Sequence, residues 1–343
     1  MTARRRHALY YLSLVRSGEG DWQRVEREIG EIRRAWRWVS TESGDQELTL
    51  EYAQGLRGSL ETRGLWREAV EWQERALGAA RTLKRDADRA ALLVNAGWAW
   101  NAVGDRRKAL SRLRQALTLA RRIGDRDHEG AALNSLGAVS LLVGNTQAAL
   151  EHFEAALRLR AETGDLQGEA MVSLNIGQAQ RQLGQHQEAL ASFEKALPIL
   201  VSVGDQAHRA TCLNNIAGAL YAMNRKEEAA GYYRRALDAR HAIGDRRGEV
   251  ETLNNLAAVS FSQGRTEDAL SRFHESLDVA RRMDHQAAEA TILNNIAVIH
   301  QRCGQVSDAS KYFQLALEVA RRIGDRRIEA SAVKGLGRVR ADT

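Results

Sequence analysis

The sequence has almost no proline, few cysteines and no long apolar run. Ala, Leu, Arg, Glu and Gln are abundant, a composition that favours nearly continuous helix. The single proline, Pro198, should bend or delay the helix in which it falls, because it lacks a backbone donor. Cys212 and Cys303 have no ligand spacing to another cysteine, which argues against a disulfide framework and a zinc site.

No apolar stretch approaches the ~18 residues that a helix needs to cross a bilayer, and no secretory cleavage pattern follows the first residues. No strand-like alternation of apolar and polar residues is present either. These absences predict an all-α, cytoplasmic protein that does not associate with a membrane and holds neither a metal nor a cofactor.

A 40-residue repeat organises the chain. The stretch from Gly124 to Arg160 recurs from Gly164, Gly204 and Gly244, and less closely from Asp284 and Gly324, with no insertion between the copies. Such a period is typical of stacked architectures, in which each unit buries its apolar face against its neighbours. The chain also exceeds the ~250 to 300 residues at which a single core stops growing. The sequence therefore predicts an elongated solenoid.

Each repeat is expected to hold two antiparallel helices. In the reference repeat, Asp125 would cap a helix that runs to about Val143, and a second helix would run from about Thr146 to Thr163. At the pair Gly164-Asp165, the glycine suits the left-handed residue that ends one helix. The aspartate can accept hydrogen bonds from the free N–H groups that begin the next helix.

The periodicity divides the chain into three parts. Residues 1–45 do not follow the repeat and are expected to form an N-terminal cap of two helices. Residues 46–325 are expected to form seven helix pairs, and residues 326–343 one further helix that caps the C-terminal end.

The two helices of the N-terminal cap are expected from Arg4 to Arg16 and from Asp21 to Thr41, with Asp21 as the N-cap of the second. Large side chains that can anchor this cap on the first repeat are those of Trp22, Trp36 and Trp38.

Small and apolar residues recur at fixed positions, or slots, within the repeat. In the reference repeat they are Leu133, Leu136, Gly137, Ser140, Ala149, Phe153, Ala156 and Leu157. This spacing resembles the tetratricopeptide pattern W-x2-L-G-x2-Y followed by A-x3-F. The first aromatic is replaced by Leu133 and the closing proline is absent. Both departures are similar to the 40-residue subtype of kinesin light chains, Pins-type adaptors and the sensor arrays of bacterial STAND signalling ATPases. The resemblance implies a right-handed tetratricopeptide superhelix that serves as a binding platform.

Residues 26–77 resemble the segment that joins the winged-helix part of STAND regulators to their tetratricopeptide sensor. The sequence has no G-x4-GK-[ST] motif, so the resemblance implies no nucleotide chemistry. Its nine histidines occupy unrelated slots, and neither HExxH nor a serine elbow is present. We therefore expect no enzymatic activity, and the resemblance implies the sensor or docking part of a STAND-like regulator.

Asparagines recur in two adjacent columns of the predicted first helices. Adjacent helical residues point about 100° apart, so the two columns are expected to have separate roles. The second column should make structural hydrogen bonds, since a half-buried amide must be paired. It comprises Asn95, Asn175, Asn215, Asn255 and Asn295.

The first asparagine column matches a slot that faces the concave groove in tetratricopeptide arrays. A carboxamide both donates and accepts, so this column predicts a clamp for the backbone of an extended peptide. Solvated amides without a ligand are the alternative. The column comprises Asn134, Asn214, Asn254 and Asn294.

Further candidate groove residues follow on the same face of the predicted first helices. They are Trp98, Asn101, Arg181, Tyr221, Phe261, Gln301 and Arg302. Aromatic residues at exposed positions, with amides and arginines between them, predict an amphipathic surface for a peptide or protein segment. Self-contact, through a superhelix that closes on itself or on a second copy of the chain, is the alternative, so a homo-oligomer stays open.

The net charge of +6, with a pI near 9.5, makes nucleic acid the alternative partner. Much of the excess lies in ARR runs at Arg121-Arg122, Arg281-Arg282 and Arg321-Arg322, each just before a helix end. Cations at that position also complement the helix dipole, which is a purely structural explanation. A nucleic-acid-binding helical repeat is therefore the second functional hypothesis, and the salt dependence of binding distinguishes it from a peptide groove.

Overall fold

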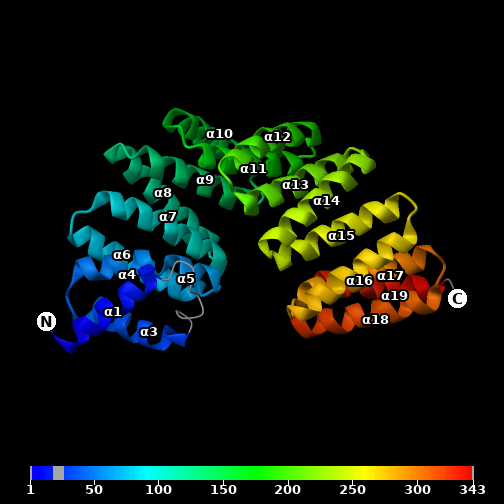
Figure 1. The fold of residues 1–343 in the computed structure, drawn as a ribbon, viewed down its shortest axis with the longest axis horizontal. Coiled ribbons are helices and arrows are strands. Elements are labelled where there is room, and N and C mark those ends of the chain that lie inside the picture. Colours follow the sequence, from blue (N-terminus) through cyan, green and yellow to red (C-terminus); the bar gives the residue numbers. More distant parts are fainter. Residues whose placement is uncertain (1, 18–26, 342–343) are drawn as a thin grey trace. The chain divides into compact units, whose positions relative to one another are not determined.

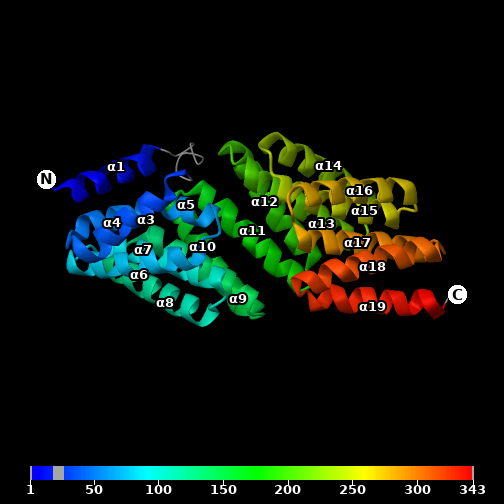
Figure 2. The ribbon, with the colours of Figure 1, turned by 90° about the horizontal axis from the view of Figure 1, so that it is seen from below.

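The computed structural model describes residues 2–17 and 27–341, and within these it is all-α, with no strand. The chain divides into two compact units, Met1–Val172 (unit 1) and Ser173–Thr343 (unit 2), which are described separately. Within each unit, successive helices run back and forth and stack side by side as antiparallel pairs (Figures 1 and 2).

The helices of unit 1 are α1 (Ala3–Ser17), α3 (Ile29–Arg37), the π-helical turn η1 (Trp38–Glu42), α4 (Gln46–Gly55), α5 (Arg57–Thr62), α6 (Trp66–Thr82), α7 (Asp86–Val103), α8 (Arg106–Ile123), α9 (Arg126–Leu142) and α10 (Thr146–Thr163). Helix α11 (Leu166–Gln182) spans the boundary between the units. The helices of unit 2 that follow it are α12 (His186–Ser202), α13 (Gln206–Ala222), α14 (Lys226–Ile243), α15 (Arg246–Ser262), α16 (Thr266–Arg282), α17 (Gln286–Arg302), α18 (Val306–Ile323) and α19 (Arg326–Ala341).

Glycine and aspartate form the turns between pairs as the sequence predicts. Gly124 ends α8 with a φ of 72°, in the left-handed region. The Asp125 side chain then accepts a hydrogen bond from the backbone N–H of His128, at 3.0 Å, and begins α9. In the less regular copy, Asp284 takes the left-handed conformation with a φ of 51°, and His285 caps α17 instead. The left-handed residue and the N-cap are therefore both present in this copy, although the residues differ.

Small residues let the two helices of a pair approach closely. A Cβ atom on Gly137 of α9 would lie 2.5 Å from two ring carbons of Phe153 in α10, so the ring occupies the space of the missing side chain. Gly177 and Phe193 repeat this contact in unit 2. The rings of Phe153 and Phe193 are fully buried. This contact explains why the slot of Gly137 holds Gly or Ala from Gly97 to Ala297.

The N-terminal cap differs from the prediction. The expected helix over residues 21–41 is α-helical only over α3, and it continues as the π-helical turn η1. Two side-chain hydroxyls bond backbone carbonyls at this wider turn. Thr41 donates to the carbonyl of Arg37, and Ser43 donates to the carbonyl of Val39. Asp21 and Trp22 lie outside the described residues.

Trp36 anchors the cap as expected. Its ring is 3% exposed and stacks on Trp72 of α6 with the ring centroids 4.5 Å apart. Trp38 is only partly buried. The first helix of the first pair is divided at Leu56 into α4 and α5, whereas α12 runs through Pro198 without a break. The expected delay of that helix at Pro198 is therefore wrong.

Candidate functional site

The two asparagine columns meet in unit 2. The side-chain amide of Asn295 in α17 donates to Asn254 Oδ1 in α15 at 3.0 Å. One pair earlier, Asn255 Nδ2 lies 3.5 Å from Asn214 Oδ1 in α13. The amides of Asn255 and Asn295 thus each reach the first-column oxygen of the preceding repeat. Asn255 and Asn295 make structural bonds, as expected of the second column, but their acceptors are first-column oxygens, so the two columns share one contact in unit 2 and the expected separation of roles does not hold there.

This asparagine ladder is largely buried. Asn214 and Asn294 are 6% and 7% exposed, and Asn214 Nδ2 also donates to Glu251 Oε1 at 3.3 Å. Among the described residues, Asn215 Nδ2 at one end and Asn294 Oδ1 at the other are buried without a hydrogen-bond partner. The slots that would complete the ladder hold Leu174 and Gly335, which offer no side-chain polar group. The ladder therefore comprises two inter-repeat bonds and ends where the sequence changes.

A cavity of about 260 Å³ opens between α15 and α17 at Asn254. Helix α15 contributes Arg247, Glu251 and Asn254 to its lining, and α17 contributes Thr291 and Ile292. Arg247 is exposed and has no ion-pair partner in the part of the chain that the structure describes. Of the first-column asparagines in unit 2, Asn254 is the one that lines this cavity. The cavity offers a cation, a carboxylate and an amide beside an apolar wall.

Aromatic groove candidates of unit 2 lie on the ends of the same first helices. Tyr221 on α13 is 37% exposed. Phe261 on α15 is half-buried and lies under the guanidinium of Arg302 on α17, 5.8 Å from its ring centroid. Gln301 is half-buried beside Arg302. The structure thus brings Phe261 and Arg302 together into one cation–π pair, which is an attractive contact in its own right.

Arg181 lies at the end of α11 near the buried phenol of Tyr233. Burial raises the pKa of Tyr233 to about 12, while the positive charge of Arg181 opposes that rise. Arg181 is exposed, and its guanidinium would lie 3.8 Å from a Cβ atom added to Gly218. The glycine therefore leaves room beside an arginine that remains accessible to a ligand.

The remaining candidates, Trp98, Asn101 and Asn134, belong to unit 1. Trp98 is 43% exposed, and Asn101 and Asn134 are half-buried. Asn101 Oδ1 is buried and has no hydrogen-bond partner among the described residues. These three residues are outside the unit 2 site.

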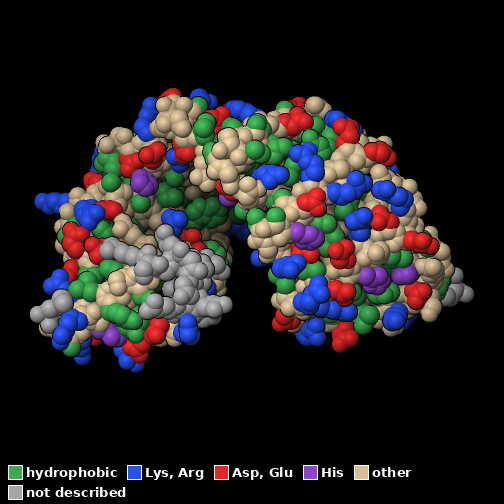
Figure 3. Space-filling model, in the orientation of Figure 1, with side chains coloured by type: hydrophobic (Ala, Val, Ile, Leu, Met, Phe, Trp, Pro, Cys, Tyr) green, Lys and Arg blue, Asp and Glu red, His purple; other side chains and the backbone are tan. Residues whose placement is uncertain are grey.

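The arginine runs are engaged in ion pairs across the turns. Arg121 pairs with Glu129 at 2.8 Å, Arg281 with Glu289 at 2.8 Å, and Arg321 with Glu329 at 2.9 Å. In Figure 3, basic and acidic side chains are interspersed over the visible face of unit 2. Each run thus contributes a structural contact between a second helix and the next first helix, in agreement with the helix-end explanation.

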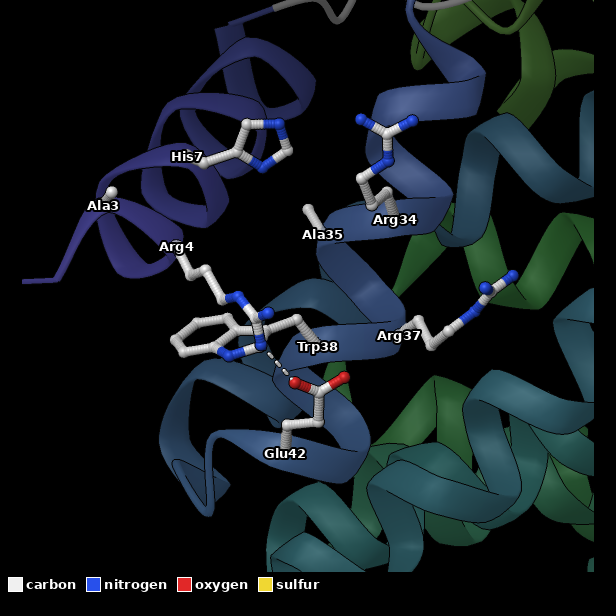
Figure 4. A pocket seen from close by; sticks show the side chains of 8 residues that line it. All are labelled: Ala3, Arg4, His7, Arg34, Ala35, Arg37, Trp38 and Glu42. Atoms are coloured by element: carbon white, nitrogen blue, oxygen red, sulfur yellow. Dashed lines mark hydrogen bonds and ion pairs between the residues drawn. The ribbon is translucent and has the colours of Figure 1, made fainter.

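A second cavity, of about 440 Å³, lies in the N-terminal cap and has no signature in the sequence pattern. Figure 4 shows it between α1 and the helix formed by α3 and η1, with Arg4, His7, Arg34 and Trp38 among the side chains that line it. Most of its charged groups are paired, Arg4 with Glu42 at 2.5 Å and both His7 and Arg34 with Glu31 at 3.1 Å, whereas the exposed Arg37 has no ion-pair partner among the described residues.

Among the residues that the structure describes, no group of three or more His, Cys, Asp or Glu side chains is placed to hold a metal ion. No helix in the described part is long and apolar enough to span a bilayer.

Family models identify the repeat. A model described as tetratricopeptide repeat matches residues 101–162, 128–202, 168–242 and 213–282, and a second model of the same description matches residues 290–323. The matches together cover more than half of the sequence. The chain belongs to the tetratricopeptide repeat family. No curated protein sequence matches this tetratricopeptide repeat protein.

Solved structures share the fold at low identity. BtubC (BKLC) from P. vanneervenii is 23% identical, with a TM-score of 0.58 over 64% of this chain and 92% of its own. A STAND protein with a tetratricopeptide repeat sensor from Pyrococcus horikoshii is 15% identical, with a TM-score of 0.67 over 94% of this chain and 50% of its own. This tetratricopeptide repeat chain thus spans half the length of that STAND protein.

A Rap protein complexed with competence and sporulation factor is 11% identical, with a TM-score of 0.60 over 97% of this chain and 98% of its own. At these identities the similarities establish the architecture of a tetratricopeptide scaffold.

Proposed function

We propose that unit 2 of this tetratricopeptide repeat protein binds a peptide or protein segment along α13, α15 and α17. The observation that carries the proposal is the cavity at Asn254, which is bordered by an exposed arginine without an ion-pair partner in the described part of the chain. Tyr221 and the Phe261–Arg302 pair extend the surface on the neighbouring helix ends. The protein serves as a binding scaffold and not as an enzyme.

The chemistry of the cavity suits a polypeptide ligand. A peptide presents N–H donors and carbonyl acceptors at every residue, and the Asn254 amide and the Glu251 carboxylate complement both. Arg247 complements an acidic side chain or a terminal carboxylate. Ile292 supplies an apolar wall for one buried side chain of the ligand. The expected ligand is a short segment with one apolar anchor beside one carboxylate.

In unit 1, Trp98, Asn101 and Asn134 occupy related slots, and we assign to them a contact surface of the same kind. The two surfaces are independent sites in this proposal, and each can be tested on its own.

A cavity-filling variant tests the unit 2 site. Thr291→Trp places an indole at the cavity lining, whereas Ala131→Trp places one at the same repeat slot in unit 1, where the residue is equally half-buried. Peptides selected from a random display library against the purified wild-type chain should bind Thr291→Trp at least ~10-fold more weakly, which corresponds to ~1.4 kcal/mol. They should bind Ala131→Trp as they bind the wild type. Equal binding to all three proteins, with helicity unchanged, would show that the cavity is not the site.

Nucleic acid is the alternative ligand, and salt separates the two hypotheses. Affinity for nucleic acid falls steeply with added salt because counterions are released on binding. A peptide held by one ion pair and one apolar anchor should show a much shallower dependence. Tight, salt-sensitive binding of DNA or RNA that ignores Thr291→Trp would favour the alternative.

The similarity of residues 26–77 to STAND linkers supports a place for this array as the sensor of a signalling regulator. In such a protein, ligand binding to the array should change nucleotide turnover of an ATPase joined to its N-terminus. A fusion to a STAND ATPase, assayed with and without a selected peptide, tests this. Turnover that does not respond to a peptide known to bind would remove the sensor role and leave the scaffold role.

A further inference from the structure

Helix α8 carries an exposed stripe of one charge sign. Its sequence RRKALSRLRQALTLARRI contains seven basic residues and no acidic one. Along one face, Arg107, Arg114 and Arg122 are exposed and are spaced by seven and eight residues, about 10 and 12 Å along the helix. The exposed hydroxyls of Ser111 and Thr118 lie between them. The stripe is therefore basic, polar and accessible over most of the helix.

The charge of this stripe is poorly compensated within unit 1. Arg107 and Arg114 have no ion-pair partner among the described residues, and Arg122 shares the Asp86 carboxylate with Arg89. A cleft of about 590 Å³ runs beside the stripe, where Leu93 of α7 meets Leu119 of α8, and no carboxylate lines it. A cationic cleft of this kind attracts an acidic surface.

Helix α10 carries the complementary stripe at the same repeat slots, 40 residues later. Its exposed residues there are Gln147, Glu151, Glu154, Arg158 and Glu162. Glu151 and Glu154 have no ion-pair partner in the described part of the chain, whereas Glu162 pairs with Arg126 at 2.8 Å. Each of these α10 residues can bond the α8 residue at the same slot. The slots pair Gln147 with Arg107, Glu151 with Ser111, Glu154 with Arg114, Arg158 with Thr118 and Glu162 with Arg122.

The two stripes lie on the second helices of two consecutive pairs of unit 1. Helices α8, α9 and α10 follow one another along unit 1 (Figure 1). Burial is the main cause that lowers the pKa of His152 in α10, but Arg114 and Arg121 of α8 lower it further. The positive charge of α8 therefore reaches α10.

Two-fold symmetry makes this surface complementary to itself. In the arrangement proposed below, a two-fold axis runs along the two helices, midway between them, and places α8 of one copy on α10 of the other with equal slots opposite one another. Arg114 then meets Glu154 of the second copy, and Arg122 meets Glu162. Symmetry repeats each contact, since a two-fold interface uses the same patch on both subunits.

We propose that unit 1 docks on unit 1 of a second copy of this chain through the α8 and α10 stripes. The cationic cleft beside α8 receives the carboxylates of the partner helix. This dimer does not rest on the peptide site of unit 2. In unit 2 the slot of Arg114 and Glu154 holds Glu194 in α12, Arg234 in α14 and His274 in α16, but the other slots of α12 hold Gln187, Ala191, Pro198 and Ser202, so the full complementarity is not repeated there.

Charge reversals test the pairing. Arg114→Glu and Glu154→Arg each turn two symmetric attractions into repulsions, and each should weaken the dimer at least ~10-fold in sedimentation equilibrium. The double variant Arg114→Glu/Glu154→Arg restores opposite charges at both contacts and should dimerise again. A mixture of the two single variants should form a heterodimer, because Glu faces Arg at both contacts.

Arg234→Glu is the matched control, since it reverses an exposed arginine at the same slot of α14 in unit 2. It should dimerise like the wild type, and all variants should keep wild-type helicity. The wild-type dimer should weaken between about 0.1 M and 1 M salt, as the Debye length shortens from about 10 Å to about 3 Å. A chain that stays monomeric in low salt, a dimer indifferent to the single reversals, or a mixture that forms no heterodimer would overturn the proposal.

Discussion

Asn295 Nδ2 lies 3.0 Å from Asn254 Oδ1, and this bond joins the first helices of two consecutive repeats, α17 and α15. It is a part-buried polar contact beside the cavity that α15 and α17 line with Arg247, Glu251 and Thr291. Because a buried amide is costly when unpaired, the bond favours one alignment of neighbouring repeats over others.

Replacing Asn254 by Ala should destabilise the chain by about 1–3 kcal/mol, because the Asn295 amide loses its acceptor. Leucine already occupies the slot of Asn254 at Leu174. The double variant Asn254→Leu/Asn295→Leu should therefore lose less free energy of unfolding than the sum of the losses in Asn254→Leu and Asn295→Leu. Urea denaturation of the wild type, the two single variants and the double variant measures this difference, expected at about 1 kcal/mol. Strict additivity would show that the two amides do not interact.

Gly248→Ala should destabilise unit 2 by about 1–3 kcal/mol, through overpacking. A Cβ atom there would lie 2.6 Å from Nε of Arg240, whose side chain is 3% exposed and donates to the Gly248 carbonyl. Gly231 on α14 has nothing within 4 Å of an added Cβ atom, so Gly231→Ala should stabilise by up to about 1 kcal/mol through helix propensity. Thermal melts of both variants provide the comparison, and equal effects would contradict the packing explanation.

Ser260→Ala should raise the pKa of Asp268. The buried Ser260 hydroxyl donates to Asp268 Oδ2 at 2.6 Å and is the main cause that holds this pKa below its ordinary value, with Arg272 adding to it. Loss of the bond should cost about 1–2 kcal/mol at neutral pH.

Ionised Asp268 stabilises the fold fully above the ordinary carboxyl pKa, and this stabilisation is lost as the pH falls through the lowered pKa of the folded state. The loss of stability in Ser260→Ala should therefore vanish in acid. An NMR titration of the carboxyl together with urea melts tests both parts. Ser262→Ala is the control, since that hydroxyl donates to a carbonyl of its own helix. An unchanged Asp268 titration would refute the assignment.

His152 should make the chain less stable in mild acid. Burial lowers its pKa, with Arg114 and Arg121 adding to the effect and Glu151 opposing it. The unfolded chain therefore takes up the proton at a higher pH than the folded chain does. Stability is full above the ordinary histidine pKa of about 6.5 and falls as the pH drops below it. Urea midpoints measured between pH 8 and pH 5 should decline less in His152→Gln than in the wild type. Parallel declines would assign the acid sensitivity to other groups.

Features set within one repeat could be predicted from the sequence. The turn at Gly124 and Asp125 depends on one left-handed residue and one capping carboxylate, and the sequence GD identifies both. The contact of Gly137 with Phe153 follows from a fixed spacing inside a helix pair.

Features that depend on a neighbour could not be predicted from the sequence in the same way. The helical geometry of Asn254 and Asn255 gives their angular separation, but it does not say which side chains the adjacent repeats supply. The η1 turn likewise depends on hydroxyl bonds from Thr41 and Ser43 that no periodic pattern encodes. The cavity at Asn254 also depends on how α15 and α17 pack together, so only its asparagine had a recognisable signal.

The constant frame has a consequence for how such an array grows. From α7 to α19, every first helix begins 40 residues after the one before, at Asp86, Arg126, Leu166, Gln206, Arg246, Gln286 and Arg326. Duplication or loss of one whole module leaves both junctions in register and needs no new linker. Excision of residues 206–245 would bring Asn255 to the slot that follows Leu174, which Asn215 holds in the intact chain, and would remove the bond between Asn255 and Asn214. The modules are therefore interchangeable in length, whereas the number of asparagine bonds depends on which modules are adjacent.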